Sequence, residues 1–191
     1  METIIKTPKS ALTLYDLDKN IYDLIPDIIY EIKDNLVTNP EIKIFGKIAK
    51  QRRSVGFFSD ESIGYKYSGK LMPAQILTGG LKCLLEYINT KFGAMFNGIL
   101  VNYYIDGNEY IGKHSDDEKN VDEIGVIAIS SGAIRKFRIR DKKTNQIIND
   151  IPTDPSKIIQ MSGDFQKEFT HEIPVEKKVK NGRYSFTFRK H

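Results

Sequence analysis

The 191-residue chain contains one cysteine and no tryptophan. A single thiol excludes a disulfide bond within the chain. Cys83 stands among Leu81, Leu84 and Leu85, and this apolar setting favours a buried small side chain over a reactive thiol. The cysteine usage therefore indicates a reducing compartment.

Long hydrophobic runs are also missing. The longest apolar stretches, such as Val126–Ile129, are far too short to span a bilayer. The first ten residues, METIIKTPKS, lack the apolar segment of a secretion signal. We expect a soluble intracellular protein in the nucleus or the cytoplasm, with no membrane association and as a monomer.

Charge and length bound the remaining possibilities. The net charge of +4 and the pI near 8.9 permit an acidic partner such as nucleic acid but do not require one. The length and the 40% hydrophobic content predict one domain over residues 1–191 with a proper core.

Helical spacing dominates the first half of the chain. We expect a loosely ordered lead-in over residues 1–17 and then a helix over 21–32, where isoleucines and a leucine recur at helical spacing. Pro26 should kink that helix or open its later part. A second helical segment is predicted to begin at Pro73, with a break at Gly79-Gly80.

Extended patterns dominate after Phe96, interrupted by a polar hairpin loop at 142–155. This order predicts an α+β, mainly β fold: an antiparallel double-sheet jelly roll (double-stranded β-helix) with N-terminal supporting helices on one side. The jelly-roll core would cover about residues 96–190.

Histidine is scarce, with only three in the chain. One is the terminal His191; the others are His171 and His114, the latter within His114-Ser115-Asp116 after an expected strand. Residues i and i+2 of extended chain point to the same face, so His114 and Asp116 can reach one ion. Two imidazoles and a carboxylate form the ligand set of non-haem Fe(II) oxygenases. Alone, the His-x-Asp pattern is weak, because most histidines bind no metal.

The segment Arg183–Arg189 alternates strictly. As a strand it places three aromatic residues on one face and the polar residues Arg183, Ser185, Thr187 and Arg189 on the other. One reading is an edge strand with a solvated basic face. The other is a clamp for a dicarboxylate, since guanidinium groups offer paired donors to carboxylates. Beside an iron site, such a clamp suggests 2-oxoglutarate.

Four motifs occur in order: Asn102-x-Tyr104, His114-x-Asp116-Asp117-Glu118, the distant His171, and Arg183-x-Ser185-x-Thr187-Phe188-Arg189. Together they resemble the AlkB family of Fe(II)- and 2-oxoglutarate-dependent dioxygenases, over about residues 42–190 and nearest to its eukaryotic DNA-repair branch. The resemblance implies the same double-stranded β-helix. It also implies iron on His114, Asp116 and His171, with 2-oxoglutarate and dioxygen as co-substrates.

The resemblance implies further contacts to the co-substrate. Arg183 and Arg189 would hold its carboxylates, helped by Asn102, Tyr104 and Thr187. Without the resemblance, Asn102 and Tyr104 could simply satisfy groups within a sheet. Ser185 stands where the family usually has asparagine, so one hydrogen bond could be bridged by water.

A basic stretch before the core carries an apolar tip, Ile44-Phe45-Gly46, among lysines and arginines that favour phosphate. Such a run is usually plain surface, but apolar wedges can enter a base stack. The resemblance makes Phe45 a finger residue and residues 42–70 a nucleotide-recognition lid. The expected substrate contacts are Phe45, Gly46, Lys47, Arg53, Tyr65, Lys66, Tyr67, Asp117 and Glu118.

The AlkB resemblance implies oxidative demethylation of N-alkylated nucleobases, 1-methyladenine and 3-methylcytosine, in DNA that is double-stranded. These bases are cationic and carry amino groups that Asp117 could accept from. Tyr67 is the better candidate to stack on an extruded base. Two alternatives stay open: an RNA demethylase of the same family, and an inactive nucleic-acid-binding module with this fold.

Overall fold

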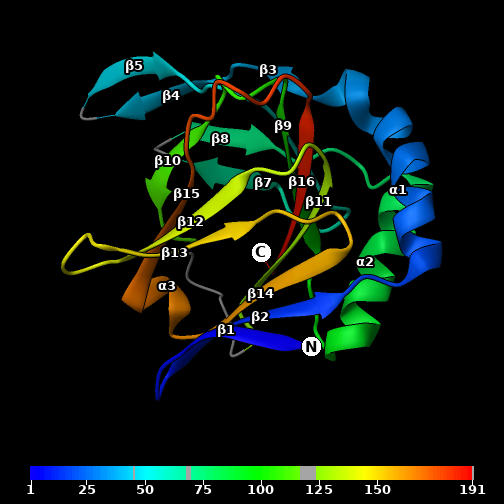
Figure 1. Ribbon diagram of the computed structural model, residues 1–191. Helices are drawn as coiled ribbons and strands as arrows, with labels where there is room; N and C mark the ends of the chain where they lie inside the picture. The colour runs from blue at the N-terminus through cyan, green and yellow to red at the C-terminus, as the bar shows by residue number, and fades with distance from the viewer. Residues whose placement is uncertain (45, 68–69, 117–123, 191) are drawn as a thin grey trace.

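Two antiparallel sheets face each other in the computed structural model, which describes residues 1–44, 46–67, 70–116 and 124–190 (Figure 1). The larger sheet has eight strands in the order β1-β2-β14-β11-β16-β9-β6-β3. The smaller has four, in the order β10-β15-β12-β13. This is the jelly-roll-like, mainly β architecture that the sequence predicts, without a closed barrel.

The strands of the larger sheet are β1 (Glu2–Lys6), β2 (Ser10–Asp16), β3 (Val37–Thr38), β6 (Ser54–Phe58), β9 (Gly98–Tyr104), β11 (Val126–Gly132), β14 (Lys157–Gly163) and β16 (Arg183–Arg189). Those of the smaller sheet are β10 (Ile111–His114), β12 (Lys136–Asp141), β13 (Ile147–Pro152) and β15 (Phe169–Ile173). Two separate hairpins consist of β4 (Glu41–Ile44) with β5 (Lys47–Lys50) and of β7 (Gly64–Tyr67) with β8 (Lys70–Pro73). The helices are α1 (Lys19–Ile32), the 3₁₀ turn η1 (Lys33–Asn35), α2 (Gly79–Phe92) and the short α3 (Phe165–Glu168).

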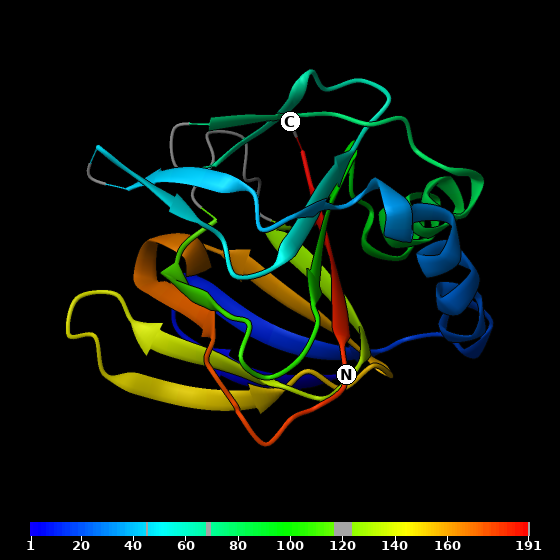
Figure 2. The same ribbon diagram turned by 90° about the horizontal axis from the view of Figure 1, so that it is seen from above.

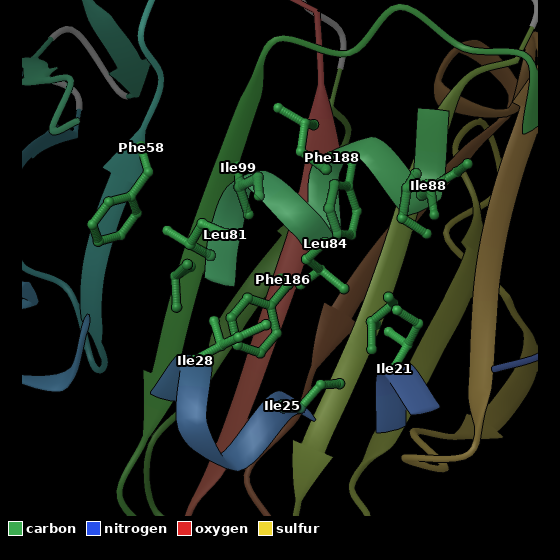
Figure 3. Close-up of a cluster of buried hydrophobic side chains, with 14 of the residues drawn as sticks. Ile21, Ile25, Ile28, Phe58, Leu81, Leu84, Ile88, Ile99, Phe186 and Phe188 are labelled. Atoms are coloured by element: carbon green, nitrogen blue, oxygen red, sulfur yellow. The ribbon is translucent and has the colours of Figure 1, made fainter. Parts of the chain in front are cut away.

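Helices α1 and α2 run side by side along one face of the larger sheet, and the β4–β5 hairpin projects on the opposite side of the molecule (Figures 1 and 2). Buried isoleucine and leucine side chains of both helices pack on the strands, as Figure 3 shows for Ile28, Leu84, Phe186 and Phe188. A second apolar cluster fills part of the space between the two sheets. The larger sheet is therefore packed on both faces, against the helices and against the smaller sheet. The site occupies the space that the second cluster leaves between the two sheets.

The N-terminal residues are not a loose lead-in. Strands β1 and β2 form one edge of the larger sheet, and β2 pairs with β14 from Ser10 to Asp16. Leu12 is fully buried there. The prediction was wrong because the partner strand lies far along the sequence, and strand formation depends on such non-local pairing.

The first helix is present where predicted, from Lys19 to Ile32. Pro26 neither ends nor opens it, because Pro26 lies on the exposed side. The carbonyl group of Tyr22 that loses its helical partner there belongs to an exposed residue.

The second helix begins at Gly79, not at Pro73, which ends β8. The hydroxyl of Thr78 caps it by accepting from the Leu81 amide at 3.3 Å. Gly79-Gly80 is thus the first turn and not a break. A Cβ on Gly80 would lie 2.7 Å from Ile28 Cγ1, so glycine lets α1 and α2 approach closely.

Two other expectations fail. Cys83 is exposed, because it lies on the side of α2 away from the buried leucines. The polar segment 142–155 contains strand β13, which pairs with β12 after a turn in which Asn145 takes a φ of 63°. No helix in the described part of the chain is long and apolar enough to cross a membrane.

Candidate metal centre

Three potential metal ligands meet between the sheets. His114 ends β10 and stands directly opposite His171 of β15 in the antiparallel ladder, while Asp116 follows two residues after His114. The ligand atoms of all three residues lie within 4.8 Å of one another. Asp116 carboxylate oxygens are 3.6 Å from His114 Nε2 and 3.5 Å from His171 Nε2. All three residues could therefore bind the same metal ion.

His114 has the charge state and the ring orientation that suit a metal ligand. His114 Nδ1 lies 2.9 Å from the Gly112 carbonyl oxygen, to which it donates as a neutral ring, leaving the Nε2 lone pair facing Asp116. Burial, together with repulsion from His171, lowers the pKa of His114 to about 3. His114 is therefore neutral at physiological pH, the form that binds metal.

Asp116 is ionised although it is buried. Burial alone would raise its pKa, but the Arg189 guanidinium and the two imidazoles hold it well below its usual range. Arg189 Nη2 donates to Asp116 Oδ1 at 2.7 Å. The backbone amide of Asp116 donates to Gln166 Oε1 at 2.9 Å, which fixes the chain at the ligand.

Strand β16 is not an edge strand. It pairs with β11 on one side and β9 on the other, so its polar face is buried in the middle of the sheet. The predicted alternation holds: Arg183, Ser185, Thr187 and Arg189 all line the cavity between the sheets. The solvated basic face considered from the sequence is therefore ruled out.

Arg183 is a buried cation that lacks a counter-ion among the described residues. Its Nη2 donates to Ser130 Oγ at 2.8 Å, and its guanidinium carbon lies 5.4 Å from the centre of the Tyr104 ring. Nε and Nη1 make no hydrogen bond to the described chain. Burial lowers the pKa of Arg183 to about 10, so it is still charged at neutral pH. Two paired donors on such a charge fit a carboxylate of a bound ligand.

The cavity encloses about 580 Å³ of empty space, counted out to its open mouth. It joins the metal ligands to Arg183 and is also lined by Asn102 and Tyr104 of β9. Asn102 Oδ1 accepts from Arg53 Nε at 2.6 Å, so its amide nitrogen is the group left for a co-substrate. The donor set and the buried cation thus fit a divalent metal with a dicarboxylate beside it.

The predicted substrate residues fall into three groups. Arg53 and Tyr65 line the cavity, and the Tyr65 hydroxyl accepts from Arg189 Nη1 at 3.1 Å. Gly46 and Lys47 lie exposed at the end of the β4–β5 hairpin, and Lys66 and Tyr67 belong to β7, their side chains being outside the described part. Phe45, Asp117 and Glu118 lie outside the described residues.

Sequence reasoning missed three residues around the site. Ser130 lies in β11, which continues to Gly132 and places the Ser130 hydroxyl on Arg183. Gln166 had no motif to mark it. Arg135, 1% exposed, joins the loops beside the cavity by donating to the carbonyl oxygens of Asp106, Glu109 and Pro174 and to Glu176.

Comparison with known proteins agrees with this geometry. The 2OG-Fe(II) oxygenase superfamily matches residues 27–189. This chain belongs to that superfamily, as a member of its AlkB family. It is 29% identical to DNA oxidative demethylase ALKBH2 of Homo sapiens over 157 residues, which cover 78% of this chain and 60% of that protein. It is 33% identical to alpha-ketoglutarate-dependent dioxygenase alkB homolog 3 of Rattus norvegicus over 115 residues, covering 56% and 39%.

The AlkB chain thus spans only part of the length of these curated relatives. A solved structure described as the structure of OsALKBH1 has the same fold, with a TM-score of 0.58, 15% identity and full coverage of both chains. The predicted family and fold are confirmed. The predicted enzyme class, an Fe(II)- and 2-oxoglutarate-dependent dioxygenase, is confirmed at the level of the family. The predicted cofactors Fe(II), 2-oxoglutarate and dioxygen are confirmed at the same level, and they suit the cluster of His114, Asp116 and His171.

Proposed function

We propose that this chain removes methyl groups oxidatively from N-alkylated bases of nucleic acid, with alkylated DNA as the main substrate and 1-methyladenine and 3-methylcytosine as the lesions. The single observation that carries the proposal is the joint presence, in one cavity, of a metal-ligand triad and a buried arginine with unsatisfied donors. Similarity to a DNA oxidative demethylase supports the choice of substrate.

The residues of the proposed site have separate roles at the metal ligands and at the two arginines of β16. His114, Asp116 and His171 would hold Fe(II), and Arg189 would keep Asp116 ionised. Arg183 would bind the carboxylate of 2-oxoglutarate that lies away from the metal, with Asn102, Tyr104, Ser185 and Thr187 around the rest of the molecule. When bound, Fe(II) with 2-oxoglutarate and dioxygen supplies the oxidation of a methyl carbon, while 2-oxoglutarate becomes succinate and carbon dioxide. The hydroxymethyl group then leaves nitrogen as formaldehyde.

Residues 42–70 would act as the nucleotide-recognition lid over a jelly-roll core of about 96–190. Exposed lysines on the β4–β5 hairpin, Lys43, Lys47 and Lys50, favour phosphate near the mouth of the cavity. Arg53 and Tyr65 would contact the flipped base together with Lys66 and Tyr67, and Asp117 with Glu118 would accept from its amino group. Phe45 and Gly46 would fill the gap that the base leaves in the stack.

The proposal is tested by following formaldehyde and succinate from a 1-methyladenine duplex, from the same lesion in single-stranded DNA, and from its RNA equivalent, with Fe(II) and 2-oxoglutarate present. We expect turnover on the duplex at least as fast as on the single strands. His171→Ala should abolish it, and Phe45→Ala should slow the duplex far more than the single strand. Turnover only on RNA would replace DNA as the substrate, and succinate production by His171→Ala equal to wild type would overturn the metal assignment.

A further inference from the structure

A second cavity lies next to the one that holds the metal ligands. It encloses about 850 Å³ of empty space, counted out to its open mouth, between the β4–β5 hairpin, the β7–β8 hairpin and β6. Arg53 and Tyr65 line both cavities, so they form a wall that the two share. Most of the remaining lining is apolar, including Ile42, Val55 and Met72. Apolar walls with a few polar groups are the composition of pockets that bind small organic molecules.

Gln51, in the wall of this cavity, has a buried side-chain oxygen without a hydrogen-bond partner among the described residues. The residue is 6% exposed. Its backbone is fixed on both sides, because the Gln51 amide donates to Pro40 at 2.9 Å and its carbonyl accepts from Asn39 Nδ2 at 2.8 Å. A buried acceptor without a donor is costly, and a ligand that brings an N–H group removes that cost.

The lining of the cavity favours one kind of ligand. Apolar walls beside the Tyr65 ring suit a flat ring, and a single buried acceptor suits an amino group on its edge. Exposed lysines on the β4–β5 hairpin would meet the phosphates of the same strand. The rim itself carries an ion pair, Lys70 Nζ to Glu41 Oε2 at 2.8 Å, that joins the two hairpins.

We propose that this cavity binds a second nucleobase, one with a free amino group, that neighbours the damaged base on the same strand, and that Gln51 Oε1 accepts from that amino group. The inference rests on the proposed function, since the damaged base would occupy the first cavity. It adds a preference, beside the lesion, for a base that carries an exocyclic amino group over thymine, which has none. A hydrogen-bonding site rejects the analogue that lacks the bonding group, because its own buried acceptor is then left unpaired.

The test compares single-stranded oligonucleotides in which the residues flanking 1-methyladenine are adenine or, in the matched strand, purine without the amino group. We expect kcat/KM to fall by about three- to tenfold on removal of the amino group, the range for one hydrogen bond. Gln51→Met keeps the shape of the side chain but removes the acceptor, and it should abolish the difference. Gln146→Met, at an exposed turn, is the control that should preserve it.

A second pair of variants blocks the cavity without touching Gln51. Leu71 lines it and is 53% exposed, so Leu71→Trp can fill it with little effect on folding, whereas Ile63→Trp places the same ring at a position 84% exposed outside the lining. Only Leu71→Trp should remove the preference for an amino-bearing neighbour. Preservation of the preference in both Gln51→Met and Leu71→Trp would overturn the assignment.

Failure here is separable from failure of the proposed function. Equal demethylation of both strands by the wild-type protein would leave the proposed function intact and refute the second subsite. If neither strand is demethylated, fluorescence anisotropy of undamaged adenine- and purine-containing strands, measured without metal, still decides the matter. Tighter binding of the adenine strand that Gln51→Met abolishes would support the subsite, and equal or absent binding would refute it.

Discussion

Arg183 and Arg189 share one face of β16, yet their surroundings differ. They are six residues apart, about 20 Å along the strand, and both are almost fully buried. Arg189 has its anion within the protein, since Asp116 accepts from it at 2.7 Å. Arg183 has no carboxylate partner among the described residues and contacts instead the Ser130 hydroxyl and the Tyr104 ring. Asp116 therefore neutralises Arg189 beside the metal ligands, and we propose that a bound ligand neutralises Arg183.

The largest effect on stability is expected from replacing Arg189, whose charge Asp116 neutralises. Arg189→Met would leave Asp116 buried without its cation, and breaking such a pair costs about 3–5 kcal/mol in the free energy of unfolding. Urea denaturation of the metal-free protein measures this loss. Mn(II) should restore part of it by supplying positive charge to Asp116. Lys180→Met, at an exposed position, is the control, and a metal-free Arg189→Met protein as stable as that control would refute the pairing.

Arg183→Met should behave in the opposite way. It removes a buried cation without a described counter-ion, so the free energy of unfolding should stay constant or rise. Affinity for 2-oxoglutarate should fall at least 30-fold, because losing one partner of a buried charge pair costs about 2–5 kcal/mol of binding. Titration calorimetry with Mn(II) in place of iron measures the affinity.

Arg183→Lys separates charge from geometry in the same experiment. Lysine keeps the positive charge but not the forked donors, so it should recover only part of the affinity. A large loss of stability in Arg183→Met with unchanged affinity would mean that Arg183 is structural, and the contrast with Arg189 would fail.

The pH dependence of stability tests the state of His114 among the metal ligands. His114 has a folded pKa of about 3, below its usual value near 6.5, so between these values the unfolded chain binds a proton that the folded chain does not. The free energy of unfolding of the metal-free protein should therefore fall as pH drops through this window, by roughly 1.4 kcal/mol per pH unit. The lowered pKa of Asp116 acts in the same direction at still lower pH. His114→Gln should flatten the slope, and an unchanged slope would contradict the buried neutral imidazole.

The sequence predicts the positions of Arg183 and Arg189 on β16 better than it predicts their surroundings. Alternation in β16 is local, so it assigns Arg183 and Arg189 to one face correctly. It cannot show whether that face is solvated, because burial depends on β11 and β9, which pair with β16 from distant positions. Strands β1 and β2 were missed for the same reason. The partners that orient the site, Gln166 and Ser130, carry no local pattern, since each acts through one hydrogen bond to a residue about 50 positions away.

Ser130 offers the smallest and most specific test of the co-substrate end. Ser130→Ala removes the acceptor of Arg183 Nη2, and the guanidinium then loses one fixed direction. One hydrogen bond is worth about 1 kcal/mol, so affinity for 2-oxoglutarate should fall about fivefold. Ser130→Thr keeps the hydroxyl and should retain most of the affinity. Ser131→Ala, the neighbouring residue on the opposite face of β11, should have no effect. Equal affinity of Ser130→Ala and Ser131→Ala would mean that stacking on Tyr104 alone aligns Arg183, because the ring lies under the guanidinium whether or not the hydroxyl is present.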